Sequence, residues 1–546
     1  MERRSFLFAA AAGTAAVAAG VAYRRWQEID PVIHAPGREL AHFLRDRGSV
    51  PPPTQIIETD IAIFGAGMAG LTAAWQLRRD GHDDFLIVDG PEPFGNAAGG
   101  RFGDLSYPTG AHYLPVPSRD CTHVRDILFD LGIIQRDPHG DKPTYDERYL
   151  LHAPEERLLV NGRWHDGIVP RAGLPAAELA QHARFFAEMD RLRGLRGTDG
   201  RRVFTLPSSA SSRDPAWLAL DTMTLKTWFG QNGYTSPTLY WYLDYCCRDD
   251  YGATAATVSA WAGLHYFCAR GGAAANAGNG AWLTWPGGLQ PLASALAQRA
   301  RARRLSGAAV TIREVDGRVE ALCCTLEHGQ PRSYLVRSRK AICAMPLFVA
   351  RRVVENMAAY GFAPGHLPAT APWLVTNFLL RGFPDELPEA PLAWDNVVYR
   401  PEGGPQLGYV VSTHQDIRVA PPERTVFTTY AALSHLDPLA GRRWLQSAPP
   451  DELLALAAAD LHAAYGRNIG SNIGRYVERA DITLRAHAMA TPRPGFRSNA
   501  GLAALQALDG PLLFAHADLS GFSVFEEASW WGLQAARKAL GGSRTS

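Results

Sequence analysis

The residues best suited to chemistry near the start of the chain are glycines that follow an apolar run. The stretch IAIFGAGMAG contains, in order, Gly65, Ala66, Gly67, Met68, Ala69 and Gly70. In this spacing the first glycine makes a tight turn, the second lets the backbone approach a pyrophosphate, and the third lets a helix pack closely on a strand. Asp89 follows 19 residues after the last glycine, where it can bind ribose hydroxyls. The pattern predicts a dinucleotide site.

These residues need a strand, a helix and a second strand to position them. Residues 59–89 fit that order, with a helix predicted to begin near Met68 and to present its N–H groups to the phosphates. Residues 285–345 contain a glycine pair, a helical stretch, a hairpin signal at Asp316-Gly317 and a closing apolar strand. We expect this second stretch to return to the nucleotide-binding core.

The continuation GNAAGGRFGDLSYPTGAHYL resembles the flavin-containing amine oxidase superfamily, which includes monoamine and polyamine oxidases and related desaturases. The resemblance implies FAD as the cofactor. It implies that Gly99, Gly100 and Arg101 lie along the diphosphate, with the arginine donating a charge-assisted hydrogen bond. It also implies that Gly110, Ala111, His112 and Tyr113 pass beside the isoalloxazine ring.

The resemblance recurs from about residue 56 to residue 540. It places Val310 where a strand residue meets the adenine, and Asp518 of FAHAD where an acid binds the ribityl or pyrophosphate region. The sequence Ser523-Val524-Phe525-Glu526 fits a capping box, which predicts a helix starting at Ser523. The N-terminus of that helix, with Ser523 and Val524, would stabilise negative charge on a reduced flavin.

Three departures from the family pattern bear on the chemistry. His516 and Glu527 stand where glycines are usual, and two extra residues separate SGF from Glu526. Asn377 stands where many amine oxidases have a lysine bonded through water to flavin N5. This weakens the case for rapid reoxidation by oxygen, so the electron acceptor, oxygen or another, stays open. No cysteine lies in the C-terminal third, so we expect non-covalent FAD.

Residues 238–252, TLYWYLDYCCRDDYG, combine aromatic and acidic side chains that could hold an ammonium group. The same spacing also fits a helix packed into the core. Five tryptophans could line the same cavity: Trp282, Trp285, Trp394, Trp530 and Trp531. Among the histidines, His112 is the one expected beside the ring, whereas His265 is expected to be structural. The active-site candidates are Asn377, His112 and Trp285.

Composition narrows the class of protein. The chain has 546 residues, 46% of them hydrophobic, enough for one large core or two joined ones. Its 55 basic and 54 acidic residues nearly cancel, which argues against nucleic acid as a partner. The seven cysteines lack a disulfide spacing and are expected to be mostly buried thiols. No spacing of metal ligands occurs, so no metal is predicted.

The first residues, with Arg3 and Arg4 before an apolar stretch, resemble a twin-arginine export signal. A membrane anchor is the alternative. We expect a periplasmic or exported protein, passed through the export machinery. Retention by an uncleaved N-terminal segment and the oligomeric state stay open. The predicted parts are a signal (1–25), a linker (26–55), an FAD-binding domain in three pieces (56–117, 281–346 and 486–546), a helical substrate insertion (118–280) and a substrate domain (347–485).

The predicted fold class is therefore α/β, with a Rossmann-type FAD-binding domain built from discontinuous segments and a mixed α+β substrate domain. The predicted reaction is hydride transfer from an amine-bearing or related small-molecule substrate to flavin N5. Two alternatives stay open. One is a desaturase or isomerase of a hydrophobic polyene, and the other is a flavin-bearing binding protein without catalysis. An acid-lined aromatic pocket would favour amines, and a broad apolar tunnel would favour polyenes.

Overall fold

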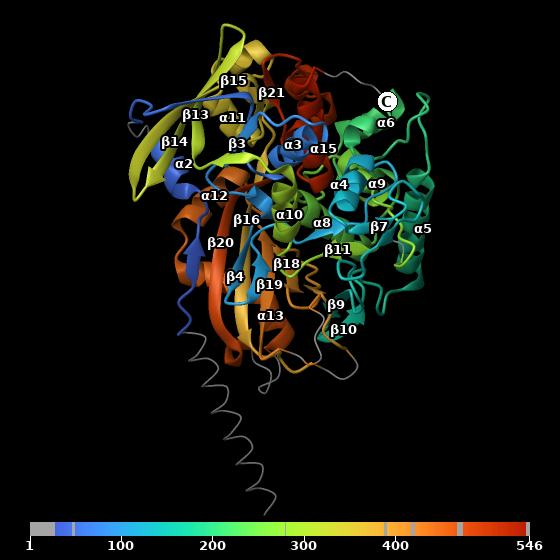
Figure 1. Cartoon of the computed structure of the whole chain (residues 1–546). Helices are drawn as coiled ribbons and strands as arrows, with labels where there is room; N and C mark the ends of the chain where they lie inside the picture. Colours follow the sequence, from blue (N-terminus) through green and yellow to red (C-terminus); the bar gives the residue numbers. More distant parts are fainter. Residues whose placement is uncertain are drawn as a thin grey trace, which may run out of the picture.

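The computed structural model describes residues 28–541, apart from 46–49, 279, 387–389, 417–419, 421 and 467–472. The predicted export signal lies outside the described residues. Two large sheets organise the molecule, with a seven-stranded sheet in the upper part of Figure 1, an eight-stranded sheet in the lower part, and a group of helices beside them.

The seven-stranded sheet is assembled from three separate stretches of the chain. Its order is β12-β3-β2-β15-β14-β13, with β21 paired to the C-terminal half of β15. The strands are β2 (Ile56–Phe64), β3 (Phe85–Val88), β12 (Arg303–Leu305), β13 (Ala308–Val315), β14 (Arg318–Glu327), β15 (Gln330–Cys343) and β21 (Leu512–Phe514). Parallel pairing of β2 with both β3 and β15 confirms the predicted βαβ unit and the return of the chain to it.

Local sequence explains these elements. The helix α3 (Met68–Arg79) begins at the predicted residue, with Gly67 as its N-cap. The β13–β14 hairpin turns at Asp316 and Gly317, both with positive φ, as the Asp-Gly pair predicts. Helices α10 (Gln290–Ala300) and α15 (Phe525–Ala539) both pack on α3. The chain's C-terminal segment therefore contacts the helix that follows the glycine turn.

The eight-stranded sheet has the order β1-β20-β16-β19-β18-β17-β9-β10. Its strands are β1 (Val32–His34), β9 (Glu156–Val160), β10 (Arg163–Asp166), β16 (Thr370–Arg381), β17 (Asp395–Val398), β18 (Gln406–Val411), β19 (Arg424–Ala432) and β20 (Val477–Ala490). Helices α12 (Pro438–Ser447) and α13 (Pro450–Tyr465) pack against it. This sheet therefore combines the predicted substrate domain with a strand pair, β9–β10, from the predicted helical insertion.

The rest of the insertion forms a helical group, on the right of Figure 1. Its helices are α4 (Thr122–Asp130), α5 (Ala176–Arg193), α6 (Pro215–Leu218), α7 (Leu225–Gln231), α8 (Pro237–Tyr251) and α9 (Ala260–Ala269). Short strand pairs lie outside the two large sheets: β4 (Gly99–Phe102) with β5 (Leu105–Pro108), β6 (Tyr113–Pro115) with β11 (Trp282–Thr284), and β7 (Ile134–Arg136) with β8 (Thr144–Tyr145). The helices α11 (Leu347–Val353) and α14 (Ala500–Ala507) flank the seven-stranded sheet near β13 and β21. Among the described helices, none has both the length and the apolar character needed to span a bilayer.

The segment predicted as a linker is partly folded, which corrects that expectation. β1 pairs in parallel with β20, and His34 contacts Asp481 at 2.8 Å. The helix α2 (Arg38–Arg45) buries Leu40 against Ala308 and Cys324 on the other sheet. A few apolar side chains at helical spacing are enough to dock a segment whose polar and proline-rich composition suggested otherwise.

Candidate active site

The glycine turn between β2 and α3 has the geometry that a dinucleotide requires. Gly65 has φ +117°, and a side chain there would lie 2.6 Å from the carbonyl oxygen of Ala344. A side chain at Gly70 would clash with the carbonyl oxygen of Gly65. At Gly67 an added Cβ meets nothing within 4 Å, and no side chain caps the helix there. The helix end thus offers N–H groups and open space, so these residues fit a pyrophosphate.

Asp89 lies directly after β3, at the same end of the sheet. Its Oδ1 accepts a hydrogen bond of 2.7 Å from Arg304 Nε at the neighbouring strand β12. A carboxylate has acceptor capacity beyond one such bond, so Asp89 can still bind ribose hydroxyls. Val310, predicted to meet the adenine, is at a register shift in β13 and packs with the cluster formed by Leu40, Ala308 and Cys324.

The C-terminal segment of the chain reaches the glycine turn between β2 and α3. Asp518 is buried, and its Oδ2 accepts the N–H of Leu347 at 2.9 Å, three residues after Ala344, which packs against Gly65. Burial alone would raise the pKa of Asp518, but His516 at 3.2 Å and the Leu347 N–H hold it below its usual value. The two cofactor signals, more than 400 residues apart, therefore adjoin one turn.

The predicted capping box at Ser523 is wrong. The helix α15 begins at Phe525 with Val524 as N-cap, and the side chain of Val524 makes no capping hydrogen bond. The Ser523 hydroxyl instead accepts the N–H of Ala490 at 2.9 Å, at the end of β20. Glu527, in the family's glycine position, accepts the N–H of Ser208 and the hydroxyl of Ser520. The spacing of the residues matched the capping motif, but the Ser523 hydroxyl is hydrogen-bonded to a strand that is distant in sequence.

The segment 99–113 leads from the dinucleotide turn to the eight-stranded sheet. A side chain at Gly99 would lie 2.8 Å from the carbonyl oxygen of Tyr107, and one at Gly100 would clash with the Tyr107 ring. Arg101 is exposed and donates at 3.5 Å to the carbonyl of Asp104. A side chain at Gly110 would clash with the carbonyl of Asn96. The glycines therefore allow close backbone approaches in this segment.

Asn377 holds this segment in place. It is fully buried in β16, its Nδ2 donates to the carbonyl of Pro108 at 3.0 Å, and its Oδ1 accepts the hydroxyl of Thr428 at 2.7 Å. Ala111 is fixed from the other side, because its carbonyl accepts the N–H of Leu289 at 3.0 Å. Both polar ends of the Asn377 amide are occupied, so this residue positions residues 108–111.

After this segment the chain enters a narrow cavity with aromatic walls. His112 stacks on Tyr430, with ring centroids 4.5 Å apart, and lies 5.4 Å from the Trp394 ring. Burial lowers the pKa of His112 to about 3, so its imidazole is neutral. The other aromatic residues of the wall are Tyr113, Tyr245, Tyr266, Trp282 and Tyr409. The free volume is only about 30 Å³, which is room for about one water molecule.

Three carboxylates face this cavity: Glu156 from β9, Asp249 from α8 and Asp395 from β17. Burial, with smaller contributions from Glu155, Asp249 and Asp166, raises the pKa of Glu156 to about 7. Burial and Asp250 raise the pKa of Asp249 to about 6. Burial and Glu156 raise the pKa of Asp395 well above its usual value. The cavity therefore gathers three carboxyl groups in a poorly hydrated place, where their charged forms are disfavoured.

Beyond Glu156 lies a wider outer chamber of about 700 Å³. It shares Glu156, Ile168, Tyr266 and Trp282 with the inner cavity, so these four residues lie between the two. Glu155, Asp166, His165 and Arg171 also line the chamber. The inner cavity thus adjoins an outer chamber with acidic residues on its wall.

Only some of the aromatic and acidic residues of the predicted 238–252 segment line the cavities. On α8, Tyr245 and Asp249 face the cavity and Tyr242 lines the outer chamber. Asp249 accepts a hydrogen bond of 3.2 Å from the Tyr113 hydroxyl. The remaining residues have other tasks: Trp241 stacks on Tyr245, Tyr240 packs on Phe229, Asp244 pairs with Arg248, and Asp250 pairs with Arg270. Core packing therefore accounts for part of this helix, while Tyr245 and Asp249 face the cavity.

Of the five predicted tryptophans, Trp282 and Trp394 line the cavity. Trp285 lies outside that wall and packs on Tyr149, Trp530 contacts His123, and Trp531 donates to Ser520. Their large apolar surfaces are used in packing between elements. Sequence reasoning missed Glu156 and Asp395, because each is a single acid in an ordinary strand and only tertiary structure brings them together.

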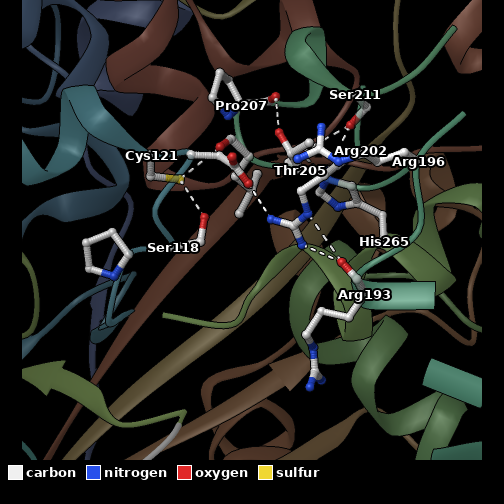
Figure 2. A network of polar contacts seen from close by, with 12 residues as sticks. Ser118, Cys121, Arg193, Arg196, Arg202, Thr205, Pro207, Ser211 and His265 are labelled. Carbon is white, nitrogen blue, oxygen red and sulfur yellow. Dashed lines mark hydrogen bonds and ion pairs between the residues drawn. The ribbon is translucent and has the colours of Figure 1, made fainter. Parts of the chain in front are cut away.

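His265 has a structural role, as predicted. Figure 2 shows it beside the 202–211 segment, where its Nε2 donates to the carbonyl of Thr205 at 2.7 Å. Burial lowers the pKa of His265 to about 3. In the same network Cys121 donates to the Leu206 carbonyl, and Arg202 donates to the carbonyl of Arg193. All seven cysteines are buried and unpaired, as expected, and within the described residues no group of three or more His, Cys, Asp or Glu is arranged to hold a metal.

Comparison with known proteins agrees with this architecture. A family model described as an NAD(P)-binding Rossmann-like domain matches residues 63–131. No curated protein matches the chain. Among solved structures, a mutant of putrescine oxidase is similar with a TM-score of 0.62 at 14% identity, covering 89% of this chain and 99% of that one.

Two further solved structures show the same likeness. Cyclohexylamine oxidase from Brevibacterium oxydans has a TM-score of 0.59 at 18% identity, covering 88% of this chain and 99% of that one. A fatty acid isomerase from P. acnes has a TM-score of 0.58 at 15% identity, with coverages of 87% and 97%. The predicted fold class is confirmed: the chain has an α/β fold with a Rossmann-type dinucleotide-binding domain built from separated segments, which it shares with these enzymes.

Proposed function

We propose that the protein is an oxidoreductase that binds FAD non-covalently and removes a hydride from the carbon next to an amine nitrogen. The observation that carries this proposal is the acid-lined aromatic cavity that begins at His112, directly after the segment tied to the dinucleotide turn. Two of the similar structures are, by their names, oxidases of amines, putrescine oxidase and cyclohexylamine oxidase. The walls of the cavity favour an amine over an apolar polyene.

The cofactor would be held by groups from both ends of the chain. The first turn of α3 at Gly67 would bind the pyrophosphate, Asp89 the adenosine ribose, and Asp518 the ribityl or pyrophosphate region. When bound, FAD supplies the hydride acceptor, a chemistry that no amino-acid side chain provides.

The side chains of the cavity have three tasks. Asp249, oriented by the Tyr113 hydroxyl, would bind the substrate ammonium through a charge-assisted hydrogen bond. With a pKa of about 6, its carboxylate can also take the ammonium proton when the amine must be neutral to react. The stacked rings of His112 and Tyr430 exclude water, and the neutral imidazole adds no positive charge that would repel the substrate.

The electron acceptor is proposed to be something other than oxygen. The amide of Asn377 is bonded to Pro108 and Thr428, and it carries no charge. We therefore expect the reduced enzyme to react slowly with air and faster with a quinone or a dye. The measurement is the rate at which flavin absorbance returns with each acceptor after anaerobic reduction.

The proposal is tested by anaerobic titration of the yellow holoenzyme with monoamines, diamines, amino acids and unsaturated fatty acids. Bleaching of the flavin band by an amine is the expected result. Conversion of a fatty acid without net bleaching would support the isomerase alternative, consistent with the similar fatty acid isomerase structure. A flavin that no donor bleaches would support a binding role without catalysis.

Export through the twin-arginine route is proposed from the sequence alone, from Arg3, Arg4 and the apolar stretch that follows. Fractionation of cells that produce the chain, compared with cells that produce an Arg3→Lys, Arg4→Lys variant, tests it. Export of the unchanged chain and retention of the variant are expected.

A further inference from the structure

We infer that residues 29–45 form a strap that closes the adenosine end of the dinucleotide site, so that the cofactor leaves only when the strap detaches. This inference rests on the cofactor part of the proposed function and is independent of the substrate. It is supported by where the strap is anchored, and by the cofactor residues that adjoin these anchors.

The first anchor of the strap is the eight-stranded sheet. β1 pairs in parallel with β20 and forms the edge of this sheet, with Val32 opposite Asp481. His34 Nε2 lies 2.8 Å from Asp481 Oδ2, and the Asp481 side chain is only 3% exposed. Ile29 and Ile33 pack against the apolar cluster of the same sheet. The first part of the strap is therefore fixed to the sheet that contributes to the cavity wall.

The second anchor is the seven-stranded sheet, on which α2 lies. Leu40 is buried in a small apolar cluster with Ala308 of β13 and Cys324 of β14. Phe43, about one turn later in the helix, packs against the same cluster. Figure 1 shows α2 beside β14 and the blue β1 beside β20. One short segment therefore joins the two large sheets.

Between the two anchors, the strap passes the residues that follow Asp89. Gly37 lies at the turn from β1 to α2 and has φ +70°. A Cβ at Gly37 would lie 2.5 Å from the Cβ of Pro91, so a glycine lets the backbone come this close. Pro91 is two residues after Asp89. The strap therefore lies against the end of the segment proposed to bind the ribose.

The second anchor adjoins the other side of the same end of the site. With the pyrophosphate at Gly67 and the ribose at Asp89, the adenosine runs from the N-terminus of α3 past the end of β3. Gly90, directly after Asp89, donates its N–H to the carbonyl of Gly307 at 2.9 Å. The residue after Gly307 is Ala308, which clusters with Leu40 of the strap. Both chain segments at the adenosine end are therefore next to strap contacts.

A further cofactor segment is tied to the first anchor. Besides the contact with His34, the carboxylate of Asp481 accepts Arg479 Nη2 at 3.0 Å and the Tyr107 hydroxyl at 3.4 Å. The Tyr107 ring lies against Gly100, in the segment that leads from the dinucleotide turn to the cavity. The strap and this segment therefore share one buried carboxylate.

The strap can detach while both sheets stay folded. β1 has three residues, and Leu40 is the only buried side chain among the described residues of α2. Segments with so few buried contacts open more easily than the sheets on which they lie. A cofactor that binds better when the strap is docked also favours the docked strap, because the coupling between the two is reciprocal.

The test measures FAD release from the full-length holoprotein with Leu40→Ala, by the rise of flavin fluorescence after dilution. Release should be about tenfold faster than from the unchanged protein, because it occurs from the detached state, which this substitution populates. The matched control is Leu445→Ala, which removes a buried leucine of α12 from the cluster of the eight-stranded sheet. This control should lower the melting temperature of the apoprotein but leave the release rate within about twofold.

A second measurement follows the strap itself. Amide hydrogen exchange in α2 should be slower in the holoprotein than in the apoprotein. Leu40→Ala should remove this difference, and Leu445→Ala should keep it.

The outcomes separate the strap from the proposed function. Equal release rates for the two leucine variants, or exchange in α2 that FAD does not change, would overturn the strap and leave the proposed function standing. If the strap results hold and no amine bleaches the flavin, only the substrate part of the proposed function fails. A chain that binds no FAD would overturn both.

Discussion

Glu156 and Asp395 are register partners in the parallel strands β9 and β17, although 239 residues separate them in the chain. Neighbouring strands lie about 4.8 Å apart, so two carboxyl groups on the same face must share a small volume. Burial and Glu156 raise the pKa of Asp395, whereas burial, Glu155 and Asp249 raise the pKa of Glu156. The pair is unfavourable for the folded protein without a ligand, and this can be measured.

Replacing Glu156 by Gln should stabilise the ligand-free protein at pH 8 and have little effect at pH 5. The pKa of Glu156 is about 7 when folded against a usual value of 4.5, so between these values the folded state holds a proton that the unfolded state has released. Stability therefore falls as pH rises through this window, and the cost is complete above pH 7. We expect a gain of about 1–3 kcal/mol at pH 8 from thermal or urea unfolding.

The control for this effect is Glu58→Gln, which should change stability little at either pH because Glu58 is exposed. An equal gain for Glu156→Gln at pH 5 and pH 8 would show that the benefit comes from packing and not from the charge.

Affinity for an amine substrate should rise with pH from about 5 to about 8. Carboxylates with raised pKa values must lose their protons to bind ammonium groups, and Asp249 and Glu156 do so near pH 6 and 7. The titratable and charged groups that face them are His112, Tyr113, Glu155, His165, Asp166, Arg171, Tyr245, Asp250, Tyr266, Arg270, Asp395, Tyr409 and Tyr430. Of these, His112 stays neutral throughout the range, because its pKa is about 3.

The measurement is the half-saturating amine concentration in anaerobic flavin reduction at each pH. Glu156→Gln should flatten the upper part of the profile and leave the part near pH 6, which belongs to Asp249. A profile that is unchanged by Glu156→Gln would assign the pH dependence to other groups.

The dinucleotide half of this molecule could be predicted from sequence because its signals are local. A strand, a glycine turn and a helix occupy adjacent residues, and the Asp316-Gly317 turn fixes its hairpin without distant help. The capping box failed because local spacing does not reveal that Ser523 binds Ala490, at the end of a strand more than 30 residues earlier.

The acidic residues of the cavity could not be predicted from local sequence in the same way. Its acids come from β9, α8 and β17, and only the order of the eight-stranded sheet brings them to one cavity. The α8 segment attracted notice because its aromatic and acidic residues are adjacent, yet half of them serve packing or ion pairs such as Asp244 with Arg248. Single acids in strands carry no such signal before the sheet order is known.

Gly67→Ala and Gly70→Ala should separate cofactor binding from folding. At Gly67 the backbone has φ −76° and an added methyl group meets nothing within 4 Å, so the apoprotein should fold with unchanged stability. The methyl group would occupy the space proposed for the pyrophosphate, so FAD affinity should fall on the order of tenfold or more. FAD content after gel filtration and the melting temperature of the apoprotein are the two measurements.

At Gly70 the expected pattern is reversed. A methyl group there clashes with the Gly65 carbonyl, and overpacking of this kind costs about 1–3 kcal/mol or more. Gly70→Ala should therefore lower the melting temperature of the apoprotein itself. Full FAD retention by Gly67→Ala would contradict the proposed path of the cofactor across the N-terminus of α3.

Asn377→Leu should show whether this residue positions the segment beside the cavity. The leucine keeps the volume but leaves the carbonyl of Pro108 and the hydroxyl of Thr428 without their present partner, at a cost of about 1–3 kcal/mol. Because Pro108 leads directly to residues 110–112, flavin reduction by an amine should slow as well. The neighbouring Thr376→Val is the matched control, since the buried Thr376 hydroxyl has no hydrogen-bond partner among the described residues and its loss should cost little or nothing. Urea unfolding and stopped-flow reduction of both variants give the comparison, and equal behaviour of the two would show that the Asn377 amide does not hold the segment.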